Sequence, residues 1–286
     1  MTAIVLAFIA AAFLGAALVL TRFGLRHIGP LQGAAISIPT FTLLFICLSP
    51  LLLRGETIVW SAIPIFAAVG LVFPSMLTLL TFESNRVLGP VITGALGNLS
   101  PLFAVALAVV LLHEPLSTLQ VVGLVVIVVG VIAITMTRPQ AARDWRTWML
   151  LLPIGAAAVR GLIQPTIKLG LEIWPSPIAA GLTGYIVSAL VVLVFARIKF
   201  GRFVADAPRA GKLWFAAVGI SNGIGVLSMY AALGNGPVAL VAPLIATYPL
   251  VTVGLSALAL GRVESAARLA AGTALTVVGV VILLAG

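Results

Sequence analysis

Three polar side chains recur at four-residue spacing within an otherwise apolar stretch: Arg160, Gln164 and Lys168. Residues four apart lie on the same face of an α-helix, so the three form one polar stripe. An arginine guanidinium holds a carboxylate or a phosphate through two parallel hydrogen bonds. Pro165, beside the stripe, has no backbone N–H and should free a carbonyl for a ligand. The stripe therefore predicts a site for an anionic or zwitterionic solute, with Arg160 and Gln164 binding the substrate.

Two further apolar stretches place polar residues directly before a proline. Asn98 and Ser100 stand before Pro101, and Thr247 and Tyr248 stand before Pro249. Irregular backbone at membrane depth is tolerated where it lines a cavity. We therefore expect the following substrate-binding residues and gating or hinge prolines: Arg160, Gln164, Asn98, Ser100, Asn222, Thr247 and Tyr248, with Pro101, Pro165 and Pro249.

Each of these polar residues also has a purely structural alternative. Arg160 could pack against backbone carbonyls or extend its charge towards the membrane surface. The neutral residues could join helices through hydrogen bonds worth about 0.6 kcal/mol each. The sequence leaves these alternatives open.

The remaining residues that could carry chemistry argue against an enzyme. All seven acidic residues fall in loops or at the ends of apolar stretches. His27 and His113 have no Cys, His or acid at metal-ligand spacing, and no nucleotide-binding or catalytic motif is present. We therefore expect no catalytic residue, no metal site and no cofactor. Proton coupling through a carboxylate at the membrane centre is disfavoured.

The amino-acid composition predicts the kind of helix that carries this polar stripe. Of 286 residues, 62% are hydrophobic and 8% are charged, whereas an ordinary soluble domain has about 45–50% apolar and about 25% charged residues. Lipid accommodates so much apolar surface, and each crossing needs about 20 residues. The sequence predicts an all-α integral membrane protein with ten transmembrane helices, at residues 3–21, 33–53, 62–82, 89–112, 119–137, 147–170, 177–196, 213–233, 237–260 and 267–285.

The basic residues define an orientation and argue against a nucleic-acid partner. The net charge is +9, but the basic residues stand in short loops between apolar stretches. Thirteen fall in the odd-numbered loops, and two, Arg54 and Lys168, fall on the other side. Because basic residues mark cytoplasmic loops, both termini are predicted to be non-cytoplasmic. The first apolar stretch has no preceding basic residue, unlike a cleaved signal, and the compact loops suggest a cell inner membrane.

Short matches at a nearly constant separation show that the chain repeats itself. Four segments recur at separations of 147 to 149 residues: 67–70 as 216–219, 89–91 as 236–238, 101–102 as 249–250 and 128–131 as 277–280. A looser match relates Gly15 and Arg22 to Gly161 and Lys168. We expect a first five-helix repeat over 1–137, a cytoplasmic linker over 138–146 and a second repeat over 147–286. Because five is odd, the second repeat enters the membrane inverted, an arrangement typical of transporters.

The fourth and fifth predicted helices also resemble those of a known family. Pro101 lies in the fourth, Glu114 at its end, and Gly123 and Gly130 in the fifth. This pattern is similar to the EamA family of the drug/metabolite transporter superfamily, and the resemblance covers nearly the whole chain. The second copy departs from it, because Glu264 is shifted by about one position. The resemblance implies a ten-helix carrier of small metabolites, often an exporter.

The repeat and the polar stripe together favour a secondary transporter working by alternating access. Its solutes would be small metabolites such as amino acids or related anionic or zwitterionic compounds. The alternative is an integral-membrane enzyme acting on lipid or isoprenoid substrates, although such an enzyme normally clusters acids, histidines or serines near one interface. The expected partners are a small-molecule solute and the lipid bilayer. We expect a monomer or a weak homodimer, because the Gly219-xxx-Gly223 pattern favours helix packing within the fold.

Overall fold

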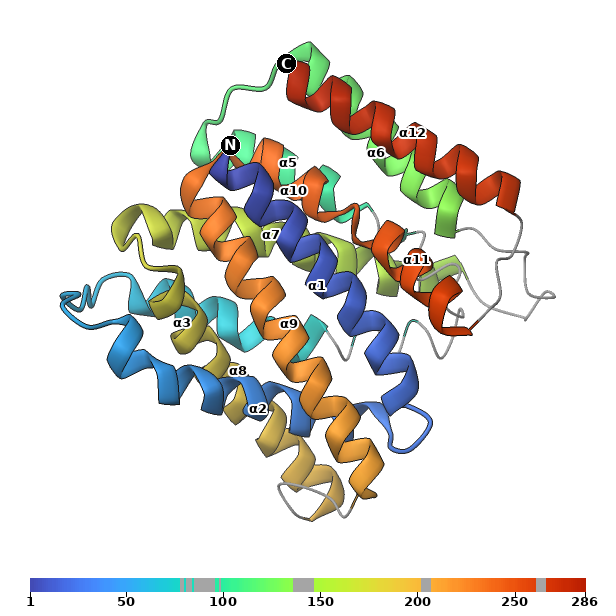
Figure 1. The fold of residues 1–286 in the computed structure, drawn as a ribbon. Helices are drawn as coiled ribbons and strands as arrows, with labels where there is room; N and C mark the ends of the chain where they lie inside the picture. The colour runs from blue at the N-terminus through green and yellow to red at the C-terminus, as the bar shows by residue number, and fades with distance from the viewer. Residues whose placement is uncertain are drawn as a thin grey trace.

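The computed structural model of the chain describes residues 1–77, 80, 84, 96–97, 99–135, 147–201, 207–260 and 266–286, and the regular structure of these residues is helical (Figure 1). The first half contains α1 (Thr2–Gly24), α2 (Pro30–Leu52), α3 (Ile63–Val72), α5 (Ser100–Leu112) and α6 (Thr118–Thr135). The second half begins with a short 3-10 turn, Thr147–Leu150, and contains α7 (Leu151–Ile173), α8 (Pro177–Phe200), α9 (Arg209–Asn235), α10 (Val238–Ile245), α11 (Tyr248–Leu260) and α12 (Ala266–Ala285).

Within the described residues, five helices are long and apolar enough to cross a membrane by length and composition. They are α1, α2, α7, α8 and α9, with spans of at least 22 residues, and about 20 residues cross the hydrocarbon core. Shorter apolar helical segments lie between them: Ile63–Leu77, Ser100–Leu112, Thr118–Ala133, Val238–Thr252 and Ala271–Ala285. The chain is therefore an all-helical, multi-pass membrane protein.

The ninth predicted span, 237–260, is not one continuous helix. α10 ends at Ile245 and α11 begins at Tyr248, so the break falls directly before Pro249. A proline cannot donate to the preceding turn, and its ring disfavours a helical residue before it. The third predicted span, 62–82, is also interrupted, because Phe73 before Pro74 takes an extended conformation with φ −128° and ψ 131°.

Helices of the first half pack mainly against helices of the second half. α1 packs against α9 and α11, and α7 packs in the corresponding way against α3 and α5. α2 lies against α8, and α6 lies against α12. When α1 is exchanged for α7, α9 for α3 and α11 for α5, the contacts of α1 become those of α7. The α2–α8 and α6–α12 pairs each join a helix to its own counterpart. The packing therefore follows the repeat that the sequence contains.

Glycines at related positions allow two of these close approaches. A Cβ atom at Gly15 would lie 2.7 Å from the carbonyl oxygen of Tyr248, and one at Gly161 would lie 2.9 Å from that of Ser100. Since real Cβ atoms keep a longer distance, only glycine fits at either position without a backbone shift. The α1–α11 and α7–α5 contacts thus use the same device in the two halves.

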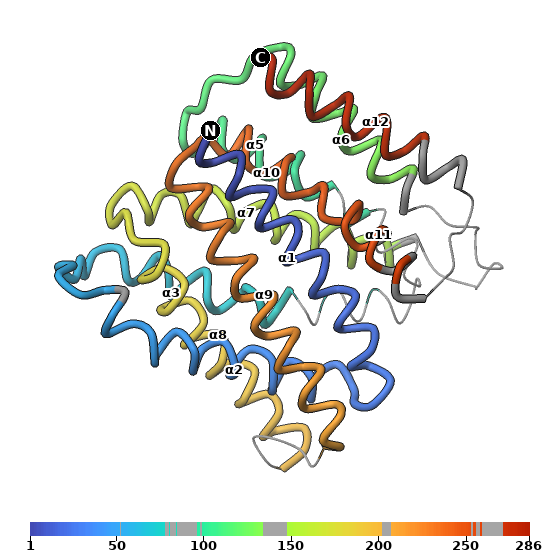
Figure 2. Tube along the Cα trace, in the orientation of Figure 1, coloured from blue at the N-terminus to red at the C-terminus, as the bar shows by residue number. Residues whose placement is uncertain are grey.

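α6 and α12 form an antiparallel pair at one side of the bundle (Figure 1). Gly123 on α6 faces Gly279 and Leu283 on α12, whereas Gly130, seven residues on, faces Gly272 and Thr276. The numbering runs in opposite directions along the seam, so the two helices are antiparallel. The chain accordingly ends at Gly286 beside Ser117 and Leu119, where α6 begins, as the Cα trace shows (Figure 2).

The interior of the bundle is apolar and closely packed, while large apolar side chains also cover its outside. Tyr230, Phe66 and Ile167 are among the largest fully buried side chains. Ile198 and Leu258, by contrast, are 76% and 85% exposed. In water such a surface would be costly, but a bilayer solvates it, and its backbone groups are satisfied within helices.

Candidate functional site

A cavity of about 240 Å³ lies between the two halves of the chain. It is lined by residues of α1, α2, α5, α7, α8, α9, α10 and α11, and also by the segment that follows α3. Five of the residues predicted to bind substrate are among those that line it: Ser100, Arg160, Gln164, Asn222 and Tyr248. The fold thus brings together polar residues that are up to 148 positions apart in the sequence.

Among the described residues that line the cavity, Arg160 is the single charged one. Its Nη1 donates a hydrogen bond to the hydroxyl oxygen of Tyr248 across 3.1 Å. A guanidinium has five N–H donors in a planar fork. Among the described residues Tyr248 occupies one of these donors, so the guanidinium remains equipped to bind a carboxylate through two hydrogen bonds.

Gln164 lies one helical turn beyond Arg160 and is 5% exposed. Its Oε1 is a buried side-chain acceptor with no hydrogen-bond partner among the described residues. Most buried polar atoms in folded proteins are paired, and an unpaired one asks for an explanation. The close contact of Gly161 with α5 places Gln164 and Ser100 in the same part of the bundle.

The apolar wall of the cavity complements this polar group. It includes Ile38 on α2, Phe215 and Val226 on α9, and Ile245 at the end of α10. On α1 the wall includes Leu14. A site with a few convergent polar groups in an apolar cavity is the usual form of a small-molecule site.

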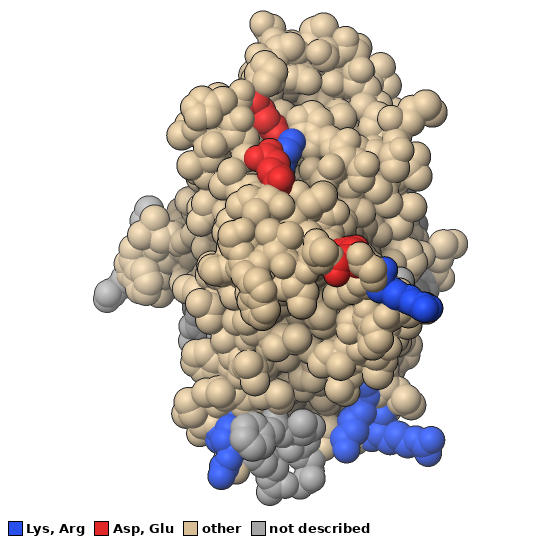
Figure 3. All heavy atoms as spheres, turned by 90° about the vertical axis from the view of Figure 1, so that its left-hand side faces the viewer, with Lys and Arg blue, Asp and Glu red and all other residues tan. Residues whose placement is uncertain are grey.

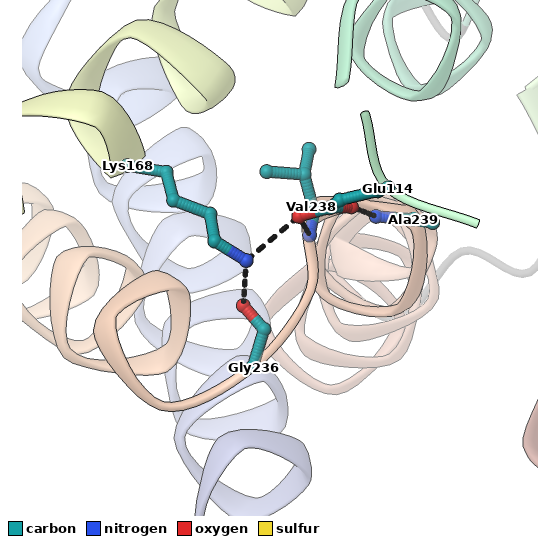
Figure 4. A network of polar contacts seen from close by, with 5 residues as sticks. All are labelled: Glu114, Lys168, Gly236, Val238 and Ala239. Atoms are coloured by element: carbon teal, nitrogen blue, oxygen red, sulfur yellow. Dashed lines mark hydrogen bonds and ion pairs between the residues drawn. The ribbon is translucent and has the colours of Figure 1, made fainter. Parts of the chain in front are cut away.

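A buried ion pair joins the two halves at one end of the bundle (Figure 4). Oε1 of Glu114, just beyond α5, lies 2.7 Å from Nζ of Lys168 on α7. The same oxygen accepts the backbone N–H of Val238 at 2.9 Å, and Oε2 accepts that of Ala239 at 3.1 Å. Nζ of Lys168 also donates to the carbonyl of Gly236 at 3.0 Å. We call this group, Glu114, Lys168, Gly236, Val238 and Ala239, the ion-pair network.

The ion-pair network explains how α10 can begin inside the protein. The first N–H groups of a helix have no intrahelical partner and carry a partial positive charge. The carboxylate of Glu114 satisfies two of them, at Val238 and Ala239. The side chains of Glu114 and Lys168 are 8% and 17% exposed, and such shielded pairs are held strongly once their hydrogen bonds are complete.

The charged groups are distributed unequally over the surface. Figure 3 shows a largely uncharged face on which acidic groups lie beside basic ones, while several basic groups gather along its lower edge. Basic residues mark the end of the bundle where α1 and α8 finish and α9 begins, which we call the basic end: Arg22, Arg26, Arg197, Lys199, Arg209 and Lys212. Contact between Gly24 and Phe215 holds the end of α1 against the start of α9.

Comparison with known proteins agrees with this geometry. The model of the EamA-like transporter family matches residues 1–136 and, a second time, residues 147–285. The chain belongs to this family. The match confirms the resemblance drawn from the fourth and fifth helices, and it shows that the chain consists of two EamA repeats of the drug/metabolite transporter type.

A solved structure shares the fold of this EamA-family chain. A crystal structure, whose title describes it only as that of a protein, superimposes with a TM-score of 0.81. It is 18% identical in sequence, and the alignment covers 98% of this chain and 95% of the other. Among curated proteins, none shows significant similarity to the chain. The comparisons thus give the family and the fold, while the solute must be inferred from the cavity.

The structure places Thr247, another predicted site residue of this EamA-family protein, outside the lining of the cavity. Thr247 is buried, does not line the cavity, and donates its Oγ1 hydrogen to the carbonyl of Leu244 at 2.7 Å. The helix break before Pro249 explains this, because the hydroxyl caps the end of α10. Asn98 lies outside the described residues.

The three predicted hinge prolines occupy two kinds of position. Pro101 stands in the first turn of α5, and Pro249 stands in the first turn of α11, so both begin helices. Pro165 lies inside α7, which continues without interruption from Leu151 to Ile173. The predicted span 147–170 likewise runs through Pro165 without a break. A gating role for the three prolines stays a prediction.

Two features of the site were missed at the level of sequence. The apolar wall has no distinguishing pattern in a chain that is apolar almost throughout. Lys168 belongs to the stripe of Arg160 and Glu114 to the end of the fourth predicted helix, and neither pattern predicts the pair between them. The only signal for it was that an acid and a base both stood near the end of an apolar stretch.

Proposed function

We propose that the protein is a secondary transporter that exports or exchanges small organic solutes carrying a carboxylate, such as amino acids or related anionic or zwitterionic compounds. The observation that carries the proposal is Arg160, held against Tyr248 in a cavity between two EamA repeats. A partly buried guanidinium facing a mainly apolar cavity favours an anionic partner, and a carboxylate fits its fork. Membership in a transporter family supports movement of that solute across the bilayer rather than its chemical conversion.

We further propose ten transmembrane helices arranged as two inverted five-helix repeats, over 1–137 and 147–286, joined by a cytoplasmic linker over 138–146. The reciprocal packing of α1 and α7, and the antiparallel seam of α6 and α12, support this arrangement. Two related packings of similar energy can then alternate, one open to each side of the membrane.

The position of the cavity supports alternating access in particular. Thr21 near the end of α1, Pro30 at the start of α2 and Phe215 near the start of α9 all line it. The cavity therefore extends towards the basic end, whereas the ion-pair network lies at the other end and lines no part of it. If basic residues face the cytoplasm, this conformation is the inward-facing one, with both termini on the non-cytoplasmic side of the inner membrane.

The test of function is solute exchange by purified protein in proteoliposomes. Arg160→Ala should lower carboxylate exchange by about 100-fold, because removing a buried charge partner costs about 3 kcal/mol and 1.4 kcal/mol corresponds to a factor of ten. Arg209→Ala, at an exposed arginine of the basic end, is the matched control and should leave exchange unchanged. Equal exchange by wild type and Arg160→Ala would remove Arg160 from the site.

The same assay separates the transporter from the alternative of a membrane enzyme. Solute recovered from the vesicle lumen should be chemically identical to solute supplied outside. Recovery of a converted product would favour an enzyme on lipid-like substrates. A reporter fused after Gly286 tests the orientation, since it should be non-cytoplasmic, and a cytoplasmic signal would overturn the assignment from the basic residues.

A further inference from the structure

Gln164 stands out among the buried polar side chains of the bundle. Thr42, Ser221 and Thr252 each donate to a backbone carbonyl of a neighbouring helix, at 3.1, 2.8 and 3.1 Å. These hydroxyls serve as links between helices. The Oε1 atom of Gln164, in contrast, is the one buried side-chain nitrogen or oxygen of the described residues that lacks a partner. A purely structural role would have supplied one.

We propose that Gln164 is a specificity-determining residue, whose amide oxygen accepts a hydrogen bond from a donor on the carbon next to the solute carboxylate. The solute class is then a carboxylate with a neighbouring ammonium or hydroxyl group. This inference rests on the proposed function, because Arg160 must first hold the carboxylate.

The placement of the two residues suits such a solute. Arg160 and Gln164 are four residues apart on α7, so they share one face and are separated by about 6 Å along the helix axis. Both line the cavity. Arg160 offers N–H donors, which match a carboxylate, and Gln164 offers a carbonyl, which matches an N–H or O–H donor. One small molecule with both groups on adjacent carbons can therefore engage both side chains.

The opposite wall determines where the rest of the solute lies. The repeat match that pairs Gly15 with Gly161 also pairs Leu14 with Arg160 and Leu18 with Gln164. Leu14 and Leu18 both line the cavity. At these related positions α7 is polar and α1 is apolar, so we expect the charged head of the solute to face α7 and its apolar side chain to face Leu14 and Leu18.

The unpaired acceptor lets the site distinguish solutes that carry a neighbouring hydrogen-bond donor from solutes that lack one. A solute with a donor satisfies Oε1, whereas one without a donor leaves it buried and unpaired. Sites that hydrogen-bond a substrate group reject analogues lacking it far more strongly than apolar pockets reject a missing methylene. We expect wild-type exchange to favour the donor-bearing solute by about 100-fold.

The experiment compares three carboxylates with the same apolar side chain: a 2-amino acid, the matching 2-hydroxy acid and the unsubstituted acid. Each is measured as an exchange substrate of the full-length protein in proteoliposomes. In the wild type, one or both of the substituted acids should exceed the unsubstituted acid. In Gln164→Leu the ratio should fall to near one while the unsubstituted acid is still exchanged. Thr166→Val, two residues along the same helix, is the control and should retain the wild-type ratio.

Gln164→Glu provides a second variant in case the leucine variant does not fold. It keeps the acceptor and adds a negative charge, so it should favour the 2-amino acid over the 2-hydroxy acid relative to the wild type. An unchanged ratio in Gln164→Leu or Gln164→Glu, or a wild type indifferent to the donor, would overturn the role of Gln164. A wild type that exchanges none of the three acids would instead contradict the proposed function.

Discussion

α1 and α7 open the two EamA repeats and occupy equivalent places in the bundle, yet they differ in the residues of one face. The following positions are paired by the repeat: Leu14 with Arg160, Leu18 with Gln164 and Arg22 with Lys168. At the cavity, two apolar residues thus stand opposite two polar ones. In the proposed transporter, the backbone symmetry would serve the conformational change, and the different side chains would orient the solute.

Arg22 and Lys168, the third pair, carry the same charge but lie in different environments. Lys168 is bound to Glu114 and to the carbonyl of Gly236, with its side chain 17% exposed. Arg22, its counterpart, is exposed at the basic end. The acidic residue of the second copy, Glu264, lies outside the described residues. The ion-pair network therefore closes the bundle at one end, whereas the cavity extends towards the basic end.

Among the changes that test the difference between the two ends of the bundle, Glu114→Gln should cost the most stability. The change leaves Lys168 charged and shielded without its carboxylate, and breaking a buried pair costs about 3 kcal/mol. For a domain of this size, about 3 kcal/mol corresponds to a fall in Tm of about 6 °C or more. Thermal unfolding of the purified protein in detergent measures it.

Glu172→Gln is the matched control for this variant. Glu172 stands one turn beyond Lys168 on α7, at the same end of the bundle, but is exposed. Its replacement should alter Tm little, because exposed charges contribute about 0–1 kcal/mol. A similar Tm for Glu114→Gln and the wild type would show that the network does not stabilise this end.

A smaller effect is expected from Lys168→Met. Glu114 would keep two backbone N–H donors, from Val238 and Ala239, so the loss should be about 2 kcal/mol, within the range of a single hydrogen bond to a charged group. Arg22→Met makes the same change at the related position of α1. Because Arg22 is exposed, its effect should stay within about 0.5 kcal/mol. Equal losses in the two variants would contradict the unequal environments, and denaturant unfolding measures both.

The elements of the fold were largely predictable from hydropathy, because lipid requires long apolar helices and leaves few alternatives. The repeat also predicted which helices correspond, and the family match confirms that there are two copies. Local breaks were less predictable. Pro249 follows the break between α10 and α11, whereas Pro165 lies inside a continuous α7, so a proline alone does not determine whether a helix is interrupted. A helix can absorb a proline when neighbouring helices and side chains support the freed groups.

The candidate site was predictable only where polarity was rare. Arg160 and Gln164 were conspicuous against an apolar background, and the cavity brings them together with Ser100 and Tyr248. The pairing of Glu114 with Lys168 required knowledge of which helix ends meet, since these residues are 54 positions apart. Periodicity along one helix carries no information about such contacts.

The last prediction concerns the glycines that let the halves approach each other. Gly161→Ala should cost about 1–3 kcal/mol, because the new methyl group would meet the backbone of α5 at the carbonyl of Ser100. Gly15→Ala should cost a similar amount through the carbonyl of Tyr248. Gly155→Ala, with nothing within 4 Å, is the control and should stabilise α7 by up to about 1 kcal/mol, the helix preference of alanine. Unfolding curves of the three variants measure these changes in the free energy of unfolding. A large cost at Gly161 with none at Gly15 would mean that the α1–α11 and α7–α5 contacts are related in sequence but not in energy, and the two packings needed for alternating access would then be unequal.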